Sequence, residues 1–501
     1  MLNLNGAKRI VVVGGGAAGW FAALTLRSMF GPQAEVMVFE SPRIGIVGVG
    51  EGGLLNLVDS LKQLNIPVDE FARETGAAYK LGFLYEGWRD GSERDAYYHM
   101  FVDSGIEEIE WKQYGFYPLV STLTHFGIEL SQALPGFQVI AEQGSQEDAR
   151  RMLAGPACGI RPSWHFDSQR IAAYLKRVAL SRGIVHKLTE VSSVQFDETR
   201  RVTAVQTTDE SIAVDFLVDA SGLSRLVVGK ALQGEWQSFS DYLLLDRAIP
   251  FHMPHPKANP YLVTRAIAMC AGWMWQIPLL ERVGAGYVFS SRHIDEDAAV
   301  AEIERRIGMP IEPSRTLHFE PGHFKEVWQG NVMTIGLASG FVEPLEATSI
   351  GQMLEQLRNF RRVVLESGGV VSEEVIGRFN ESNARYWLGI RDFLRMHYDC
   401  PRRDTPFWRD VAQTPLPDSW RALKACMQQR LPRSIDTEGY YPHPWTSMFH
   451  SLSWVMVAAP LGLISREGAF NDMQSLPANT RERIADYMFR KWPHVVSRPL
   501  Q

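Results

Sequence analysis

Cysteine is scarce in this sequence: 501 residues contain only four, at positions 158, 270, 400 and 426. They form no C-x-x-C pair and show no metal-type spacing with histidine, which argues against a disulfide framework and against a zinc site. We therefore expect no bound metal. A reducing cytoplasm fits this cysteine usage.

Runs of like charge and long apolar segments are also missing. The net charge is −6, and no five consecutive residues share one sign, whereas nucleic-acid binding needs a basic stripe. No segment reaches the ~18 apolar residues of a membrane helix. The apolar stretch Ile10–Val13 is too short for a signal sequence and runs directly into glycines. These absences predict a soluble protein that binds neither nucleic acid nor membrane.

The overall composition, 45% hydrophobic and 22% charged, is that of a globular protein. Length alone suggests about three domains, but no internal repeat or low-complexity linker separates them. The sequence instead predicts one interwoven α/β unit over residues 1–350, with a substrate-side excursion around 79–165. A mostly helical lobe over 351–501 is expected to pack as one unit with it.

Glycine is concentrated at the start of the chain, where KRIVVVGGGAAGW (8–20) predicts a strand, a tight turn and a helix. Gly14, Gly16 and Gly19 match G-x-G-x-x-G in the required context, and Ala17 and Ala18 open a good helix that continues through 21–30. Such glycines let the backbone approach a pyrophosphate, which the helix N-terminus attracts.

A second strand, residues 35–39, ends in Glu40, where an acid would hold a ribose hydroxyl. A similar glycine pattern at 48–53 contains Glu51, which would repel a phosphate, and no acid follows it at the expected distance. The sequence therefore predicts one dinucleotide, FAD or NAD, and not both.

Further elements follow from periodicity. We expect helices over 54–64 and 166–176, the latter capped by Asp167 or Ser168, and mostly helix after residue 350. Strands are expected over 79–85, 202–207 and 213–219. Residues 104–160 are mixed and poorly periodic.

Two positions keep alternative interpretations at this stage. A strand over GWMWQIPL (272–279) would place Trp273 and Trp275 on one face, as a hydrophobic core, a stacking platform or a wall. In the strand over 79–85, Lys80 would lie on the face opposite Phe83. Taken alone, it is typical of a solvated strand lysine.

Nine motifs along nearly the whole chain resemble the flavin-dependent tryptophan halogenase family. They are GGGAAGW (14–20), GVGE (48–51), YKLGF (79–83), HMF (99–101), HFD (165–167), DR (246–247), GWMWQIP (272–278), GLASGFVEPLEATSI (336–350) and RRDTPFWRD (402–410). The G-W-x-W-x-I-P motif together with the N-terminal glycines distinguishes this family from the flavin monooxygenases that it is built like.

The resemblance implies an α/β, FAD-binding Rossmann-like fold of the flavin monooxygenase and halogenase type, with a helical C-terminal lobe. It implies FAD, taken up as FADH2 from a separate flavin reductase, and O2 as co-substrate. Reduced flavin and O2 would give a hydroperoxide, which chloride or bromide attacks to form hypohalous acid. That oxidant would pass through a tunnel to the aromatic substrate. Tunnel residues would be Trp273, Trp275, Ile277 and Pro278, and the tryptophans would form the wall between flavin and substrate.

The same resemblance implies roles for individual side chains. Lys80 would hold hypohalous acid by a hydrogen bond or as a haloamine, and burial would favour its neutral amine. Glu346 would orient the oxidant and stabilise the cationic ring intermediate; alone, it is typical of an acid at a helix N-terminus. Thr348 and Ser349 would hold the halide, although the family usually has glycine at the second position. The residues expected to contact FAD are Gly14, Gly16, Ala17, Ala18, Gly19, Glu40, Val49, Glu51, Leu337 and Ile350.

His99, Phe101 and Trp454 resemble the aromatic residues that hold an indole ring. Family members that act on free tryptophan carry a Glu five residues before this Trp and an Asn four residues after it, where this chain has Phe449 and Ala458. We therefore expect an indole-type arene without the amino-acid groups, with Tyr440 and Tyr441 as a shifted remnant of the family's tyrosines.

A flavin-dependent hydroxylase and a catalytically silent flavin-binding protein remain the alternative hypotheses. A homodimer is a further expectation from the family.

Overall fold

The computed structural model describes the chain except for residues 46–49, 93, 103–116, 156–157, 314, 442–447 and 496–501. Its internal contacts divide it into two compact units, each formed by three segments of the chain. Unit 1 comprises residues 1–78, 163–255 and 275–391, and unit 2 comprises 79–162, 256–274 and 392–501. Contacts thus group residues 351–391 with the N-terminal strands, beyond the break that the sequence suggested near residue 350.

A six-stranded sheet forms the centre of unit 1, in the order β21-β22-β13-β2-β3-β9. Its strands are β2 (Arg9–Val13), β3 (Glu35–Phe39), β9 (Val185–Lys187), β13 (Phe216–Asp219), β21 (Trp328–Gln329) and β22 (Val332–Thr334). All neighbours pair in parallel except β21 and β22. Because parallel strands need crossover connections, their carboxyl ends gather at one edge, where ligands bind in such folds.

Alternating residues of these strands enter two separate cores. Ile10 and Val12 pack with Trp20 and other residues of the helices, whereas Val11 and Val13 belong to a smaller core on the other face. The β-strand period of two explains the division, and it accounts for the unbroken apolar run of β2, which is buried on both faces.

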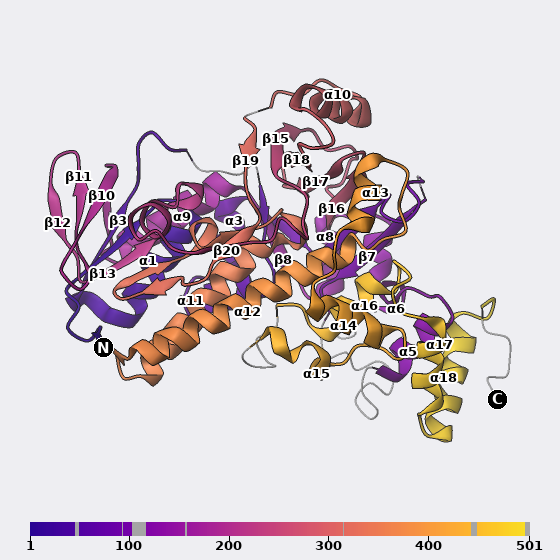
Figure 1. Cartoon of the computed structure of the whole chain (residues 1–501). Coiled ribbons are helices and arrows are strands. Elements are labelled where there is room, and N and C mark those ends of the chain that lie inside the picture. The colour runs from indigo at the N-terminus through magenta and orange to yellow at the C-terminus, as the bar shows by residue number, and fades with distance from the viewer. Residues whose placement is uncertain are drawn as a thin grey trace. The chain divides into compact units, whose positions relative to one another are not determined.

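Helices cover one face of the sheet, and a three-stranded antiparallel sheet covers the other (Figure 1). The helices of unit 1 are α1 (Ala17–Phe30), α2 (Leu55–Gln63), α3 (Val68–Thr75), α9 (Ser168–Ser181), α10 (Glu296–Ile307) and α11 (Thr348–Glu366). The covering strands are β10 (Val191–Phe196), β11 (Val202–Thr207) and β12 (Ser211–Ala213).

Further strands and short helical turns complete unit 1. The strands are β1 (Leu2–Asn3), β4 (Glu51–Gly52), β8 (Ser163–Phe166), β14 (Trp236–Ser238), β15 (Arg247–Met253), β18 (Val283–Phe289), β19 (Leu317–His318), β20 (Gly322–Phe324), β23 (Gly340–Phe341) and β24 (Val370–Val371). The turns are η1 (Gly31–Gln33), η2 (Gly222–Ser224), η3 (Leu226–Ala231), η4 (Gly336–Ala338) and η5 (Leu345–Ala347).

Unit 2 contains a short sheet and many helices. Strand β6 (Gly82–Glu86) pairs in parallel with β16 (Thr264–Met269) and antiparallel with β7 (Ala96–Met100). The helices are α5 (Tyr117–His125), α6 (Leu130–Ala133), α7 (Phe137–Ala141), α8 (Gln146–Leu153), α13 (Pro406–Gln413), α14 (Asp418–Met427), α15 (Ser434–Thr437), η6 (Glu438–Tyr440), α16 (Ser451–Ala458), α17 (Arg466–Gln474) and α18 (Ala478–Lys491). The boundary between the units falls inside β5 (Ala78–Lys80), β17 (Gly272–Pro278) and α12 (Glu373–His397).

Most elements expected from periodicity are present. Strand β11 covers 202–207 as expected, and α9 begins after Asp167, whose side chain accepts hydrogen bonds from the backbone of Gln169 and Arg170. A strand was expected over 213–219, and the observed β13 is shorter, since it begins only at Phe216. The helical C-terminal region is confirmed by α11 to α18.

The expectation of one continuous strand over 79–85 is wrong. The structure has β5 and then β6, separated at Leu81, whose N–H donates to the carbonyl of Leu262 at 2.8 Å. Gly82 follows with φ +156°, and a Cβ there would lie 2.3 Å from the carbonyl oxygen of His99. Because the strand is interrupted, side chains do not alternate regularly between its two faces from Lys80 to Phe83. Lys80 is therefore not held on the face opposite Phe83.

Within the described ranges, we find no helix with both the length and the apolar character needed to cross a membrane.

Candidate functional site

The glycine turn connects β2 directly to α1. Gly14 has φ +125°, and a Cβ there would lie 2.2 Å from the carbonyl oxygen of Ala220. A Cβ at Gly19 would lie 1.9 Å from the carbonyl oxygen of Gly14. Each position therefore admits only glycine, one because of its backbone conformation and the other because helix and turn touch.

Gly16 has a different surrounding. It is the N-cap of α1, and among the described residues no heavy atom lies within 4 Å of a Cβ built there. No described side chain caps this helix, and its first turn is free of acids. The exposed N–H groups and the positive end of the helix dipole therefore face open space, which fits the pyrophosphate of a dinucleotide.

Two further segments of unit 1 approach the same turn. Asp219 ends β13, is buried, and accepts hydrogen bonds from the N–H groups of Ser221, Val227 and Val228. It thereby fixes the loop whose Ala220 touches Gly14. From β22, the turn η4 brings Gly336 near Ala18, 2.9 Å from a Cβ built on that glycine. Leu337, one of the expected FAD contacts, lies in this turn.

Glu40 follows β3 and lies next to the glycine turn, as expected for an acid that holds ribose. Its Cγ would lie 2.5 Å from a Cβ on Gly15. Its Oε2 is 3.0 Å from Lys176 Nζ and 2.7 Å from His186 Nε2. These two partners hold the carboxylate in place. The role of Glu40 toward ribose stays a prediction.

Glu51 lies in the short strand β4, which pairs with β8. Burial raises the pKa of its carboxyl to about 7, a hydrogen bond from Ser168 opposes the shift, and the negative charge of Asp167 adds to it. Such a group is largely neutral below pH 7, which weakens the argument that it would repel a phosphate. Val49, the neighbouring expected contact, lies outside the described residues.

The loop before α11 has an unusual backbone. Glu346 has φ 64° and ψ 12°, and Ala347 has φ 53° and ψ 36°. Two consecutive non-glycine residues in the left-handed region cost on the order of 1–3 kcal/mol each, and such strain is concentrated at functional sites. The Glu346 side chain is 1% exposed, so the turn buries a carboxylate at the start of a helix.

Thr348 begins α11, followed by Ser349 and the buried Ile350. The Thr348 side chain is fully buried, and within the described chain its Oγ1 has no hydrogen-bond partner. Since buried hydroxyls normally pair, and no described side chain caps this helix, the hydroxyl and the first-turn N–H groups form a donor set that suits an anion such as a halide.

In unit 2, Lys80 is completely buried at 0% exposure, which contradicts the interpretation of a solvated strand lysine. Its Nζ lies 4.1 Å from the ring centre of Phe83 and 5.4 Å from that of Phe101. Phe83 stacks on His99 with centroids 5.9 Å apart. The break at Leu81 makes this arrangement because it lets Lys80 and Phe83 approach each other.

An aromatic cluster surrounds these residues in unit 2. His99, Phe101 and Trp454 are all buried, and their role in holding an arene stays a prediction. Phe393 connects two of them, with centroids 5.8 Å from His99 and 4.9 Å from Trp454. The sequence did not indicate Phe393, because it lies near the C-terminal end of the long helix α12 and its pattern is that of an ordinary core residue.

Two positions at which family members that act on free tryptophan were expected to carry polar side chains hold buried apolar ones here. Phe449 is 1% exposed and stacks on Phe393 with centroids 3.7 Å apart and an interplanar angle of 8°. Ala458 is buried in α16. The hydroxyl of Tyr440 donates to Asp392 at 2.8 Å, and burial, followed by that carboxylate, raises the pKa of the phenol.

The tryptophan pair lies on β17, which confirms the expected strand. Trp273 packs near Trp88, with centroids 6.5 Å apart, and Trp275 covers Gly286 of β18, where a Cβ would lie 2.1 Å from the indole ring. Both are buried, as is Pro278, whereas Ile277 is partly exposed. Their role as a wall is not tested by these contacts.

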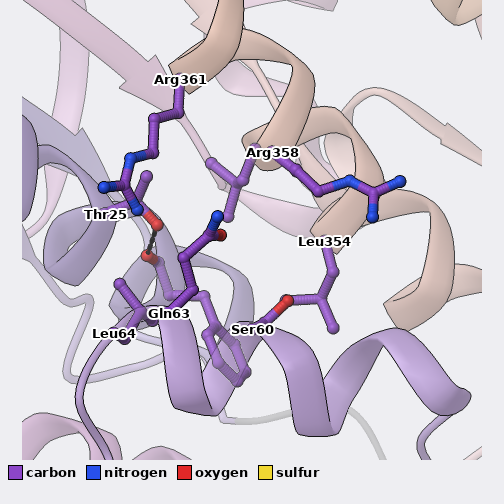
Figure 2. A pocket seen from close by; sticks show the side chains of 9 residues that line it. Thr25, Ser60, Gln63, Leu64, Leu354, Arg358 and Arg361 are labelled. Carbon is purple, nitrogen blue, oxygen red and sulfur yellow. Dashed lines mark hydrogen bonds between the residues drawn. The ribbon is translucent and has the colours of Figure 1, made fainter. Parts of the chain in front are cut away.

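A separate hollow in unit 1 lies between α2 and α11. Figure 2 shows four of the residues that line it, Ser60 and Gln63 of α2 and Arg358 and Arg361 of α11. Arg358 is paired with Glu355. None of the residues expected in the site lines this hollow, so it takes no part in the arrangement described above.

A glycine turn and an uncapped helix at the carboxyl ends of parallel strands are the arrangement at which α/β proteins bind dinucleotides. The family model "Tryptophan halogenase" matches residues 9–473, so the chain belongs to the tryptophan halogenase family and is an oxidoreductase.

Individual relatives agree with this assignment. The chain is 44% identical to the uncharacterized protein y4xG of Sinorhizobium fredii over 490 residues, covering 98% of this chain and 97% of that protein. It is 32% identical to the tryptophan 7-halogenase RebH of Lentzea aerocolonigenes, covering 91% and 90%. Among solved structures it is similar to Xcc4156, a flavin-dependent halogenase from Xanthomonas campestris, with a TM-score of 0.79 at 29% identity and coverage of 97% and 96%.

Proposed function

We propose that this protein is a FADH2-dependent halogenase that acts on an indole-type or other electron-rich arene with chloride or bromide. The observation that carries the proposal is the fully buried amine of Lys80, 4.1 Å from Phe83, in the unit that also holds His99 and Trp454. A buried amine among aromatic rings is suited to holding an electrophilic halogen beside an arene.

FAD would be held by the turn of Gly14 to Gly19, by Glu40, and by the segments that carry Ala220 and Leu337. When bound and reduced, FAD supplies the two electrons that bring O2 to the peroxide level, and oxygen at that level can oxidise halide to hypohalous acid. The overall reaction balances as ArH + X⁻ + O2 + FADH2 + H⁺ → ArX + FAD + 2 H2O. The halide would be bound by the Thr348 hydroxyl and by N–H groups at the start of α11.

The remaining steps would belong to side chains. Lys80 would hold hypohalous acid, or a haloamine formed from it with loss of water. The arene takes the halogen, and the proton that it gives up ends in water in the first case and on the Lys80 amine in the second. Glu346 would stabilise the positive charge that develops on the ring. The aromatic residues would orient the substrate, and Trp273 and Trp275 would keep it from the flavin.

Indole is the substrate type that the pocket favours. A tryptophan zwitterion would lose hydration around two charges, whereas the positions near Trp454 offer the Phe449 ring and the Ala458 methyl in place of polar partners. An indole ring has no such charges and can stack in the aromatic cluster.

The proposal includes a separate flavin reductase as partner, a cytoplasmic location and a homodimer, the last checked by light scattering. The decisive assay combines the protein with FAD, an NADH-dependent flavin reductase, bromide and indole, with catalase to remove free peroxide. A product with the bromine isotope pattern supports the proposal. A product heavier by one oxygen would indicate the hydroxylase alternative, and no product would favour the silent flavin-binding protein.

A further inference from the structure

A stripe of polar side chains runs along the buried face of α11. Thr348, Gln352 and Gln356 follow at intervals of four residues and are 0%, 1% and 3% exposed. Residues four apart lie one above another on the same side of a helix. Apolar residues normally occupy such a face, so three successive polar ones call for partners.

The inner end of this stripe has its partners. Gln356 Nε2 donates to the carbonyl of Thr334 at 2.6 Å, and Gln356 Oε1 accepts from Ser339 Oγ at 3.4 Å. Each group of this amide therefore has a protein atom within hydrogen-bond distance, and the Ser339 hydroxyl also donates to the carbonyl of Gly336 at 2.8 Å.

The end near the proposed halide site is incomplete. Gln352 Nε2 donates to Asn383 Oδ1 of α12 at 2.8 Å. Within the described part of the chain, Gln352 Oε1 and Asn383 Nδ2 have no hydrogen-bond partner, and the same holds for Thr348 Oγ1 one turn away. Exchanging oxygen and nitrogen in both amides leaves the same inventory, one acceptor oxygen and one NH2 group.

Three buried polar groups without partners among the described residues would destabilise the fold if nothing paired with them. Ordered water commonly fills such sites when two or more polar groups converge. A donor NH2, an acceptor oxygen and a hydroxyl next to an anion site can hold water that donates one hydrogen to the amide oxygen and the other to the anion.

We propose that Gln352 and Asn383 are positioning residues for the halide: together they hold buried water that completes the coordination of a halide at Thr348. This inference rests on the proposed function, since it assumes the halide site at the start of α11. It adds a determinant of halide affinity and selectivity. Chloride is more strongly hydrated than bromide, so loss of this water weakens chloride binding more.

The test compares three variants with the parent. Gln352→Met combined with Asn383→Leu removes both amides, and replacing both partners of a buried pair by apolar groups is the change least harmful to folding. Ser339→Ala is the matched control, because it removes a hydrogen bond to the next glutamine of the same stripe. Thr348→Val is the reference for direct loss of the halide site.

For the double variant we expect KM for chloride to rise about tenfold and KM for bromide about threefold, while kcat at saturating halide stays within about twofold. Ser339→Ala is expected to leave both KM values unchanged. Equal KM values in the parent and a folded, flavin-binding double variant would overturn the inference. An equal rise in Ser339→Ala would do the same, since it would show a general loss of packing.

A second measurement needs no turnover. The thermal midpoint of the FAD-loaded protein is followed during titration with sodium bromide, with sodium fluoride at equal ionic strength as reference. We expect a bromide-specific rise that shifts to higher concentration in the double variant. If the parent shows this rise but forms no halogenated product, the proposed function fails and the inference stands. A rise that is unchanged in the double variant overturns the inference alone, and no rise in the parent overturns it together with the halide site.

Discussion

The two units supply different kinds of candidate binding groups. In unit 1 the backbone supplies most of the candidate site: the turn around Gly16, the loop after Asp219 and the N-terminus of α11 present N–H groups at strand ends. In unit 2 side chains supply it, with a lysine and rings from β6, β7, α12 and α16. Backbone sites tolerate few changes of glycine, whereas side-chain sites can change specificity by single substitutions.

The largest effect is expected from replacing Lys80, which should abolish halogenation without affecting the FAD site of unit 1. Lys80→Met should reduce halogenation at least about a thousandfold, because the amine that would carry the halogen is removed. Binding of FAD in unit 1 and flavin oxidation should remain near parent values. Product formation by mass spectrometry and FAD affinity by fluorescence check both statements. Lys325→Met, at an exposed lysine paired with Glu235, is the control, and loss of FAD binding in folded Lys80→Met would show that the sites are not separate.

Glu346 belongs to unit 1, but its proposed role concerns the arene. Glu346→Gln should lower kcat about a hundredfold, or roughly 3 kcal/mol, because the neutral amide stabilises a cationic ring intermediate less. The left-handed backbone is kept, since Glu and Gln have the same Cβ. Single-turnover rates with preformed FADH2 test this, with Glu366→Gln on the exposed side of α11 as control. A parent-like rate would disprove the role.

Substrate choice is expected to respond to unit 2 alone. The parent should have a higher kcat/KM for indole than for tryptophan, measured by competition at equal concentration in one vessel. Phe449→Glu combined with Ala458→Asn should shift this ratio about tenfold toward tryptophan by providing partners for its charged groups. The single variant Ala458→Ser serves as a size-matched control. Preferential halogenation of tryptophan by the parent would mean that other residues, such as Tyr441, hold the amino acid.

The smallest effect is on stability and concerns unit 1. The pKa of Glu51 is raised from 4.5 to about 7 by burial, so its ionisation opposes folding. The unfolded chain loses this proton first, and the parent should therefore lose stability as pH rises from about 4.5 to about 7, with no further loss from this group above that pH.

Glu51→Gln removes this contribution. Its thermal midpoint relative to the parent should rise across that pH range by the equivalent of about 1–2 kcal/mol, a figure reduced from the full shift because the side chain is partly exposed. Glu374→Gln, at an exposed position of α12, is the control for the loss of a surface carboxylate. A pH-independent difference for Glu51→Gln would show that its carboxyl is not buried in this way.

The fold near the N-terminus could be predicted because its signals are local. A strand, three glycines, a helix and a terminal acid follow one another within 40 residues, and each has its own steric or electrostatic reason. Lys80, Thr348 and Glu346 were found only through family motifs, since a buried lysine and a solvated one have the same local sequence.

Other features depend on contacts between distant segments. The break at Leu81 is made by the carbonyl of Leu262, and the position of Phe393 between His99 and Trp454 requires three separate elements. Glu346 and Ala347 have left-handed backbone angles. Glycine and asparagine are the residues that usually indicate this conformation in a sequence, and neither is present in the pair. Neither strand periodicity nor helix propensity indicates any of these.

The left-handed pair also determines how mutational data at this loop should be interpreted. Glycine adopts such angles without strain, so Ala347→Gly is expected to be accepted, whereas valine or isoleucine at either position would displace the start of α11 and the Thr348 hydroxyl with it. In a saturation library, low activity at position 346 would thus have two causes, the loss of the carboxylate and the loss of the left-handed backbone conformation. Only glutamine, which preserves the backbone preference of glutamate, and glycine, which relaxes it, separate the two contributions.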